Sequence, residues 1–312
     1  DSTADTIQRI LPRTCEAINE DWISDKSRYS FEGISYQRLE KPLLRTATSF
    51  ETISWEQALV IAQERLSRKN PLKKAAIVGD LIDVEAMFAL GKLWNVIGSP
   101  HIDCRQNKSL ISTEHRSHYL FNSGIAGIDK ADAILIVGGS LRLDATLIHA
   151  RIRKACIERK VPVFGVGESQ QNWGFLFPFT SLGNDKESLE RLLTQDDKAT
   201  RTLKKAKFPL VLLMDEVLCH EGGHYIQGLC HQIVDQLGFM KRDPKGALTW
   251  NGFNVVSQAA SRVGGLDMGI VPGKEGMPTK EIIAAAESGA INTLLLMGAD
   301  EITVQPHQNC FV

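Results

Sequence analysis

The stretch at residues 130–155, KADAILIVGGSLRLDATLIHARIRKA, decides the fold. Its segment Ala133–Val137 is an uninterrupted apolar run rich in β-branched residues, which is typical of a strand buried on both faces of a parallel sheet. Gly138 and Gly139 then turn the chain, and apolar residues at helical spacing follow. Because residues 161–166 form a second apolar strand, the stretch predicts a βαβ unit, which presents ligands or partners at the carboxyl ends of its strands.

Strands and helices alternate along the rest of the chain. Further helices are expected at 54–68, 83–97, 186–194, 225–237, 254–263 and 279–288, a Gly-rich loop at 264–276, and further strands at 75–78, 101–104, 209–214 and 291–297. This alternation predicts an α/β fold of Rossmann-like parallel sheets flanked by helices. A small, β-rich lead-in is expected at 1–45. We expect a discontinuous first α/β domain at 46–118 plus 204–312, and a second Rossmann-like domain at 119–203.

Composition excludes several classes of function. The 312 residues carry a net charge of -1, which offers no basic surplus for binding nucleic acid. No apolar run approaches the length of a membrane span. The six cysteines include no C-x-x-C pair, which argues against a zinc knuckle or ferredoxin-type ligand spacing and favours free thiols in a reducing compartment. The chain lacks an initiating Met and stops at Phe311-Val312, where a further strand is expected, so we expect a fragment.

One short motif matches the zinc-protease pattern. His220 and His224 flank Glu221, Gly222 and Gly223, giving HEGGH. That chemistry needs a stable helix to hold both imidazoles on one face, and each glycine costs a helix about 1 kcal/mol. Since the motif falls between a strand end and a helix start, a loop is favoured over a metal site, and the zinc hydrolase remains an alternative.

Two glycine turns could receive a phosphate at the carboxyl ends of strands. The first is Gly138-Gly139-Ser140, and the second contains Gly165 and Gly167. Neither has the complete G-x-G-x-x-G fingerprint. A carboxylate follows each turn, Asp144 and Glu168 respectively, which opposes a dinucleotide phosphate. We therefore favour the interpretation that these glycines serve only to make tight turns, and not to bind a phosphate.

Several segments together resemble one family. They are RILPR at 9–13, NEDWISDKSRY at 19–29, QRLEKPLLR at 37–45, LFNSGIAGIDKADAILIVGG at 120–139, DATLIHARIRKA at 144–155, GGLDMG at 264–269 and LLLMGADE at 294–301. The chain resembles the large iron–sulfur subunit of respiratory complex I, the NADH:quinone oxidoreductase, in its mitochondrial and alphaproteobacterial branch. The resemblance implies the molybdopterin-oxidoreductase fold of formate dehydrogenase. It also implies 2Fe-2S and 4Fe-4S clusters in an N-terminal ferredoxin-like part outside this segment.

The same resemblance implies that the reactive groups have been lost. Ser24 stands where cluster-bearing relatives have a cysteine ligand, and a hydroxyl is a poor substitute for thiolate on iron. Lys26 matches the lysine between cluster and pterin. Cys104 is the only thiol in the segment where a metal ligand would be expected, and we do not assign it that role. A degenerate cleft is expected near Lys26, Gly138, Gly139, Ser140, Gly165 and Gly167, with no bound cofactor, no metal and no catalytic residue.

The resemblance therefore predicts a non-catalytic scaffold within an oxidoreductase. It would contact other hydrophilic-arm subunits, without nucleic acid or direct membrane insertion, on the matrix side of the inner mitochondrial membrane or the cytoplasmic side of a bacterial membrane. The alternative is an oxidoreductase fragment that still binds a molybdopterin dinucleotide.

Overall fold

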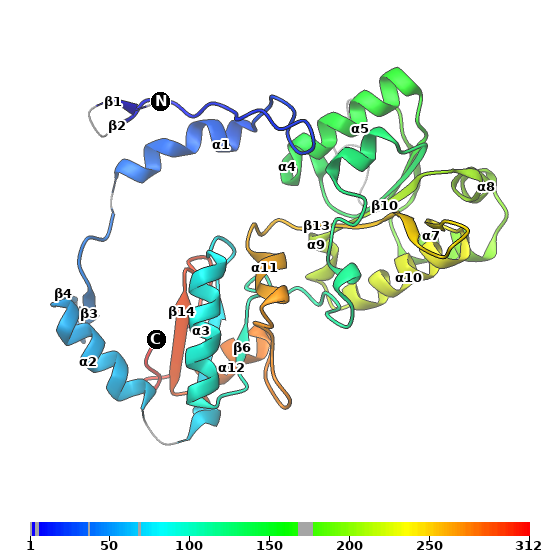
Figure 1. The fold of residues 1–312 in the computed structure, drawn as a ribbon. Helices are drawn as coiled ribbons and strands as arrows, with labels where there is room; N and C mark the ends of the chain where they lie inside the picture. Colours follow the sequence, from blue (N-terminus) through cyan, green and yellow to red (C-terminus); the bar gives the residue numbers. More distant parts are fainter. Residues whose placement is uncertain (1, 4–5, 37, 68–69, 168–176) are drawn as a thin grey trace. The chain divides into compact units, whose positions relative to one another are not determined.

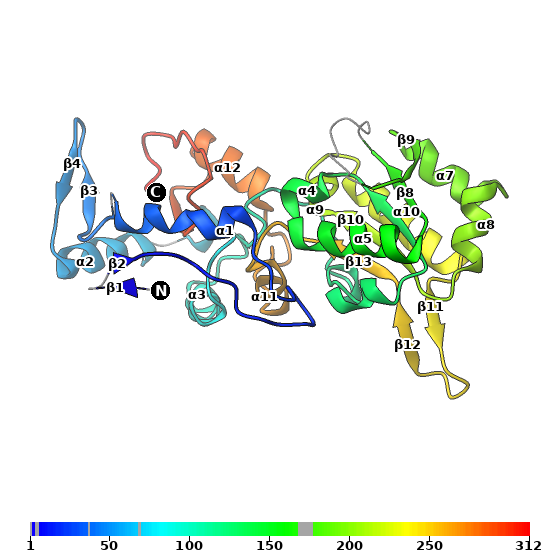
Figure 2. The ribbon, with the colours of Figure 1, turned by 90° about the horizontal axis from the view of Figure 1, so that it is seen from above.

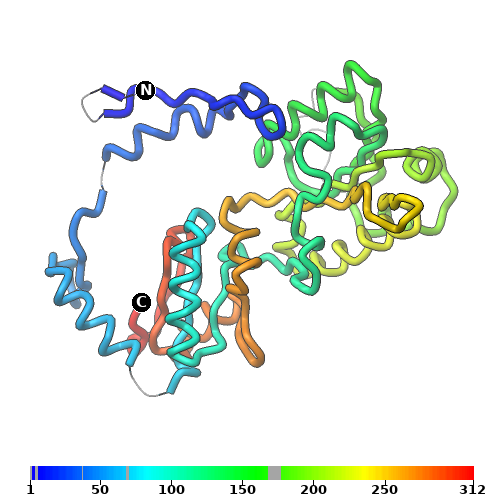
Figure 3. The backbone as a smooth tube through the Cα atoms, viewed as in Figure 1, coloured from blue at the N-terminus to red at the C-terminus, as the bar shows by residue number. Residues whose placement is uncertain are grey.

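The structure is a computed structural model that describes residues 2–3, 6–36, 38–67, 70–167 and 177–312. The chain divides into two compact units. Unit 1 comprises residues 1–2, 8–29 and 109–258, and unit 2 comprises residues 3–7, 30–108 and 259–312. The tube in Figure 3 lets the reader follow by colour how the chain contributes to each unit.

Unit 1 is built on a parallel five-stranded sheet with the order β13-β10-β7-β8-β9. Its strands are β7 (Ala133–Val137), β8 (Val163–Val166), β9 (Thr180–Gly183), β10 (Pro209–Met214) and β13 (Phe253–Val256). Every residue of β7 and β10 is buried, as their apolar composition predicts for central strands of a covered sheet. Their core side chains pack with those of α5 (Thr146–Arg159), including Ile152 and Ala155.

The other helices and strands of unit 1 can be followed by their labels in Figures 1 and 2. Helix α10 contacts β10 and β13, and α8 contacts β7. The helices are α1 (Asp25–Tyr29), α4 (Leu141–Asp144), α7 (Lys186–Thr194), α8 (Lys198–Lys205), α9 (Asp215–Leu218) and α10 (Gly223–Gln236), with 3-10 turns η3 (Arg116–His118) and η4 (Ile125–Asp129). A hairpin of β11 (Met240–Arg242) and β12 (Leu248–Asn251), clear in Figure 2, leads into β13.

Unit 2 has a smaller parallel sheet of order β14-β5-β6. The strands are β14 (Thr293–Met297), β5 (Lys74–Val78) and β6 (Ile102–Asp103). The helices are α2 (Trp55–Leu66), α3 (Val84–Ile97), α11 (Arg262–Asp267) and α12 (Thr279–Ser288), with 3-10 turns η1 (Ser30–Ser35) and η2 (Pro71–Lys73). Two short two-stranded sheets complete the strand set, β1 (Ser2–Thr3) with β2 (Thr6–Ile7) and β3 (Leu43–Arg45) with β4 (Phe50–Thr52). Within the described residues no helix is long and apolar enough to cross a bilayer.

The alternation of parallel strands with helices is confirmed, and two local predictions are wrong. Residues 254–263 do not form a helix, because Phe253–Val256 is strand β13, paired in parallel with β10. The expected Gly-rich loop at 264–276 begins inside helix α11. Both segments take their structure from partners that lie far away in the sequence, so the local sequence pattern does not predict it.

The domain boundaries expected from the sequence also differ from the observed division. Residues 209–214 were expected with the first domain, yet β10 pairs along its length with β7 of the Rossmann-like sheet. The whole of 109–258 consequently lies in unit 1.

Candidate functional site: the cleft at the carboxyl ends of the unit 1 strands

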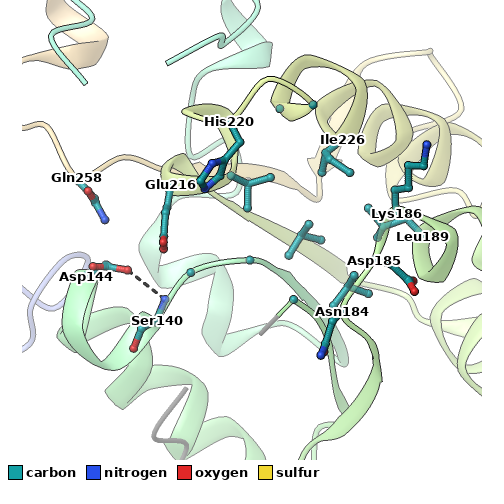
Figure 4. Close-up of a pocket in the computed structure, with 18 of the residues that line it drawn as sticks. Ser140, Asp144, Asn184, Asp185, Lys186, Leu189, Glu216, His220, Ile226 and Gln258 are labelled. Atoms are coloured by element: carbon teal, nitrogen blue, oxygen red, sulfur yellow. Dashed lines mark hydrogen bonds between the residues drawn. The ribbon is translucent and has the colours of Figure 1, made fainter. Parts of the chain in front are cut away.

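A cavity of about 780 Å³ lies where β7, β8 and β10 end (Figure 4). The chain leaves β7 toward β8 and β9 on one side and later returns to β10 and β13 on the other. The cavity therefore lies at the topological switch point of the sheet, where open α/β sheets most often bind ligands. Its lining includes Gly138, Gly139, Ser140, Asp144, Gly167, Asn184, Asp185, Lys186, Glu216, Val217, His220 and Gln258.

The first glycine turn is closely packed. Gly138 and Gly139 have φ of +74° and +65°, a conformation that favours glycine. A Cβ on Gly138 would lie 1.9 Å from Cγ2 of Val217, and one on Gly139 would lie 2.7 Å from Cβ of Met214. The turn therefore approaches the start of α9 so closely that any side chain there would clash.

The amide that follows this turn is already paired. The backbone N–H of Ser140 donates to Oδ2 of Asp144 at 3.1 Å, as the dashed line in Figure 4 shows. A bound phosphate at such a turn would need backbone donors of this kind. Asp144 supplies a negative charge from within the chain at that position.

Carboxylates dominate the charged lining of the cleft. Glu216 points into the cavity beside His220 in Figure 4. Asp185 caps α7 by accepting hydrogen bonds from the N–H and hydroxyl of Ser188, and the hydroxyl bond is the main reason that its pKa is lowered. The Nζ of Lys186 lies 5.6 Å from the ring of Tyr225. An anionic ligand would meet more negative than positive charge.

The second turn contributes less than the sequence suggested. Gly165 lies inside β8, whereas Gly167 has φ of +140° and lines the cleft. Glu168, which was expected to oppose a phosphate, lies outside the described residues.

The HEGGH motif does not form the helix-borne pair of imidazoles that a zinc protease needs. Helix α10 begins at Gly223, so His220 and Glu221 precede it. His220 lines the cleft, whereas His224 lies in the first turn of the helix. Across the described parts of the chain, no three His, Cys, Asp or Glu side chains are grouped to hold a metal ion.

Ser24 has a local role at the start of α1. Its Oγ lies 3.2 Å from both the backbone N and the Oγ of Ser27, in the manner of a helix cap. Ser24 and Lys26 line a separate hollow of about 590 Å³ that also includes Trp22. Cys15 is the only cysteine among residues 1–32, and it is exposed.

Cys104 belongs to unit 2, and the cleft is lined by residues of unit 1. Burial raises the pKa of its thiol to about 12, so it is not a thiolate at neutral pH. In the same unit Arg262, only 1% exposed, pairs with Asp80 at 3.3 Å and donates to Oδ1 of Asn107 at 2.9 Å.

Sequence reasoning found the glycines and Asp144 but missed Glu216, Lys186 and Gln258. Glu216 follows the expected strand at 209–214, so the carboxyl end of that strand was the available signal. Lys186 and Gln258 reach the cleft only because the sheet gathers distant segments.

A family model for molybdopterin oxidoreductase matches residues 38–312. The chain belongs to the molybdopterin oxidoreductase family. A second model, the 4Fe-4S domain of NADH-ubiquinone oxidoreductase NDSU1/NuoG-like proteins, matches residues 1–32. The α/β fold with parallel sheets flanked by helices, expected from the resemblance, is confirmed.

Curated relatives confirm the resemblance over the whole chain. The NADH-quinone oxidoreductase G subunit of Rickettsia typhi is 35% identical over 314 residues, covering 100% of this chain and 43% of the relative. The mitochondrial NADH-ubiquinone oxidoreductase 78 kDa subunit of Candida albicans is 34% identical, covering 95% of this chain and 39% of the relative. The mitochondrial iron-sulfur protein 1 of NADH dehydrogenase from Solanum tuberosum is 32% identical, covering 97% and 39%. The chain thus spans less than half the length of these relatives.

Among solved structures, acetylene hydratase from Pelobacter acetylenicus is similar with a TM-score of 0.34 and 20% identity, covering 51% of this chain and 23% of that chain. That likeness is too weak to support any argument about the site.

The cofactors that these family names imply are a poor fit to the described residues. For a pterin dinucleotide, Asp144 holds the Ser140 amide, and Val217 leaves no room above Gly138. For an iron–sulfur cluster, residues 1–32 offer one thiol, and Ser24 is engaged in a helix cap.

Proposed function

We propose that this chain is a non-catalytic structural part of a large iron–sulfur subunit of the complex I type. The observation that carries this proposal is the hydrogen bond from the Ser140 N–H to Asp144, because a carboxylate of the chain itself occupies a backbone donor that a phosphate in the cleft would need. The similarity to the Rickettsia protein and to its mitochondrial counterparts over nearly the whole chain supports the choice of complex.

In this proposal the chain supports electron transfer from NADH to quinone that occurs elsewhere in the complete polypeptide. Its partners are other subunits of the hydrophilic arm, on the matrix face of the inner mitochondrial membrane or the cytoplasmic face of a bacterial membrane. It contributes no catalytic residue, cluster ligand or metal ligand of its own. Ser24, His220, Glu221 and His224 are therefore structural.

The rival function is a fragment that still binds a molybdopterin dinucleotide. The size of the cleft favours it, since about 780 Å³ is within the range of small-molecule sites. The carboxylates that line the cleft oppose it, because phosphate groups would be brought close to like charges.

The two functions are separated by molybdenum starvation of cells that make the complete complex. The scaffold proposal predicts that NADH:quinone activity per assembled complex is unchanged. A loss of activity that molybdate restores would support the rival function instead.

A further inference from the structure

A closed loop at residues 13–22 lies within the segment that matches the iron–sulfur model. The N–H of Cys15 donates to the carbonyl of Glu20 at 2.8 Å. The side-chain amide of Asn19 donates to the carbonyls of Arg13 and Trp22, each at 3.0 Å. These bonds give the loop a defined shape, so it is not a flexible linker.

The loop rests on Arg151 of α5. The Arg151 side chain is only 4% exposed, and its guanidinium donates to the carbonyl oxygen of Glu16 and to a carboxylate oxygen of Asp129 in η4. A carboxylate oxygen of Glu20 lies 3.9 Å away. Lys154, one turn further along α5, pairs with Glu20 at 3.3 Å.

The type of side chain matters at this position. A buried cation must be paired, or its desolvation is uncompensated. The planar guanidinium can donate in two directions at once, here to η4 and to the loop, whereas an ammonium is a compact point charge. In the ion pair of Lys154 with Glu20 the lysine side chain is about half exposed, so this pair contributes little to the stability of the contact.

We propose that α5 and η4 form the docking surface for the loop of the iron–sulfur-type segment, and that Arg151 is the positioning residue of this joint. The surface recognises a loop that presents a backbone carbonyl beside an acidic side chain. Residues 1–32 and 38–312 match two different family models, and Arg151 connects the second region to the first. This inference rests on the proposed function in one respect only, namely that the docked segment corresponds to the 4Fe-4S domain of the NADH-ubiquinone oxidoreductase proteins.

The test is hydrogen exchange, read by NMR or mass spectrometry, on the purified chain and two Arg151 variants. Arg151→Met should accelerate exchange of the loop amides of Cys15, Glu20 and Trp22 at least about tenfold, because the loop then opens locally. Arg151→Lys should accelerate the same amides, since an ammonium does not bridge both acceptors. Exchange in β7 should remain unchanged.

Two further variants keep the test decisive. Arg153→Met is the matched control, because Arg153 is exposed on the same helix and makes no hydrogen bond or ion pair in the described residues. Asp129→Asn covers the case in which Arg151→Met does not fold, and it should accelerate the same loop amides by a smaller factor.

Unchanged loop exchange in Arg151→Met, or in Asp129→Asn where the former does not fold, would overturn the proposal. Equal acceleration in the loop and in β7 would also overturn it, because Arg151 would then stabilise the unit as a whole. Neither result depends on whether the cleft binds a cofactor, so failure here is distinguishable from failure of the proposed function.

Discussion

Ser140 and Asp144 are joined across a single turn by a 3.1 Å hydrogen bond from the backbone N–H to the carboxylate. The bond sits at the exit of the central strand β7, where an α/β sheet would ordinarily offer its free amide to a ligand. The chain thereby satisfies this backbone donor with a carboxylate of its own.

Removal of this bond should weaken the fold. Asp144→Ala should lower the free energy of unfolding by about 1 kcal/mol, because a local side-chain-to-backbone bond of the capping kind is lost. Urea unfolding measures the change. Glu158→Ala is the control, because Glu158 is exposed on α5. An equal loss of unfolding free energy in both variants would show that the Asp144 hydrogen bond does not stabilise the fold.

Gly138→Ala should be more damaging, with a loss of about 2–4 kcal/mol. The substitution combines a left-handed backbone conformation at φ +74° with a clash against Val217. Adding Val217→Ala should recover the part of this loss that comes from the clash, but not the part that comes from the backbone conformation. A double-mutant cycle would separate the two contributions. Gly222→Ala is the control, since it has ordinary φ and no heavy atom within 4 Å of its added Cβ.

The cysteines should differ sharply in reactivity. Burial raises the pKa of both Cys104 and Cys230 to about 12, whereas Cys15 is exposed. Iodoacetamide at pH 8 should therefore modify Cys15 in the native chain and leave Cys104 and Cys230 unmodified until denaturant is added. Peptide mass spectrometry reads the result, and rapid native labelling of Cys104 would refute an inert structural thiol.

Stability should fall as the solution is acidified. Burial lowers the pKa of His231 to about 4, with a smaller effect from His118, whose ring centroid is 4.3 Å away. In the unfolded chain this imidazole has its ordinary pKa of about 6.5, so between pH 6.5 and pH 4 the unfolded state binds more protons than the folded state. The stability that is present above pH 6.5 is therefore lost as the pH falls through that window. The loss should be about 1–2 kcal/mol, less than the full shift implies, because the part-buried ring is screened by solvent.

Denaturation at pH 7.5 and pH 4.5 measures this dependence in the wild type and in His231→Phe. The free energy of unfolding should fall less between the two pH values in the variant than in the wild type. If both proteins respond identically, His231 is not its source.

The features that the sequence predicted best are local ones. Helices α2 and α3 occur where helices were expected at 54–68 and 83–97. A capping box of Ser54 and Gln57 begins α2, and the left-handed Gly98 ends α3. Both depend on residues within one or two turns, which a linear pattern contains.

The features that it predicted poorly depend on distant partners. Phe253–Val256 became a strand because β10 lies beside it, and no neighbouring residue signals that pairing. Arg151 lies in a basic run that usually marks a solvated helix face, yet it is buried because Glu16 and Asp129 reach it. In the cleft, Asp144 was recognisable from its place after the glycine turn, whereas Glu216 required the three-dimensional order of the strands.

The central claim, that the cleft has lost its cofactor chemistry, is tested most directly by analysing the chain purified from cells supplied with molybdate. Elemental analysis and pterin fluorescence after denaturation should detect neither molybdenum, tungsten nor pterin in stoichiometric amount. One equivalent of pterin, with or without its metal, would contradict the claim.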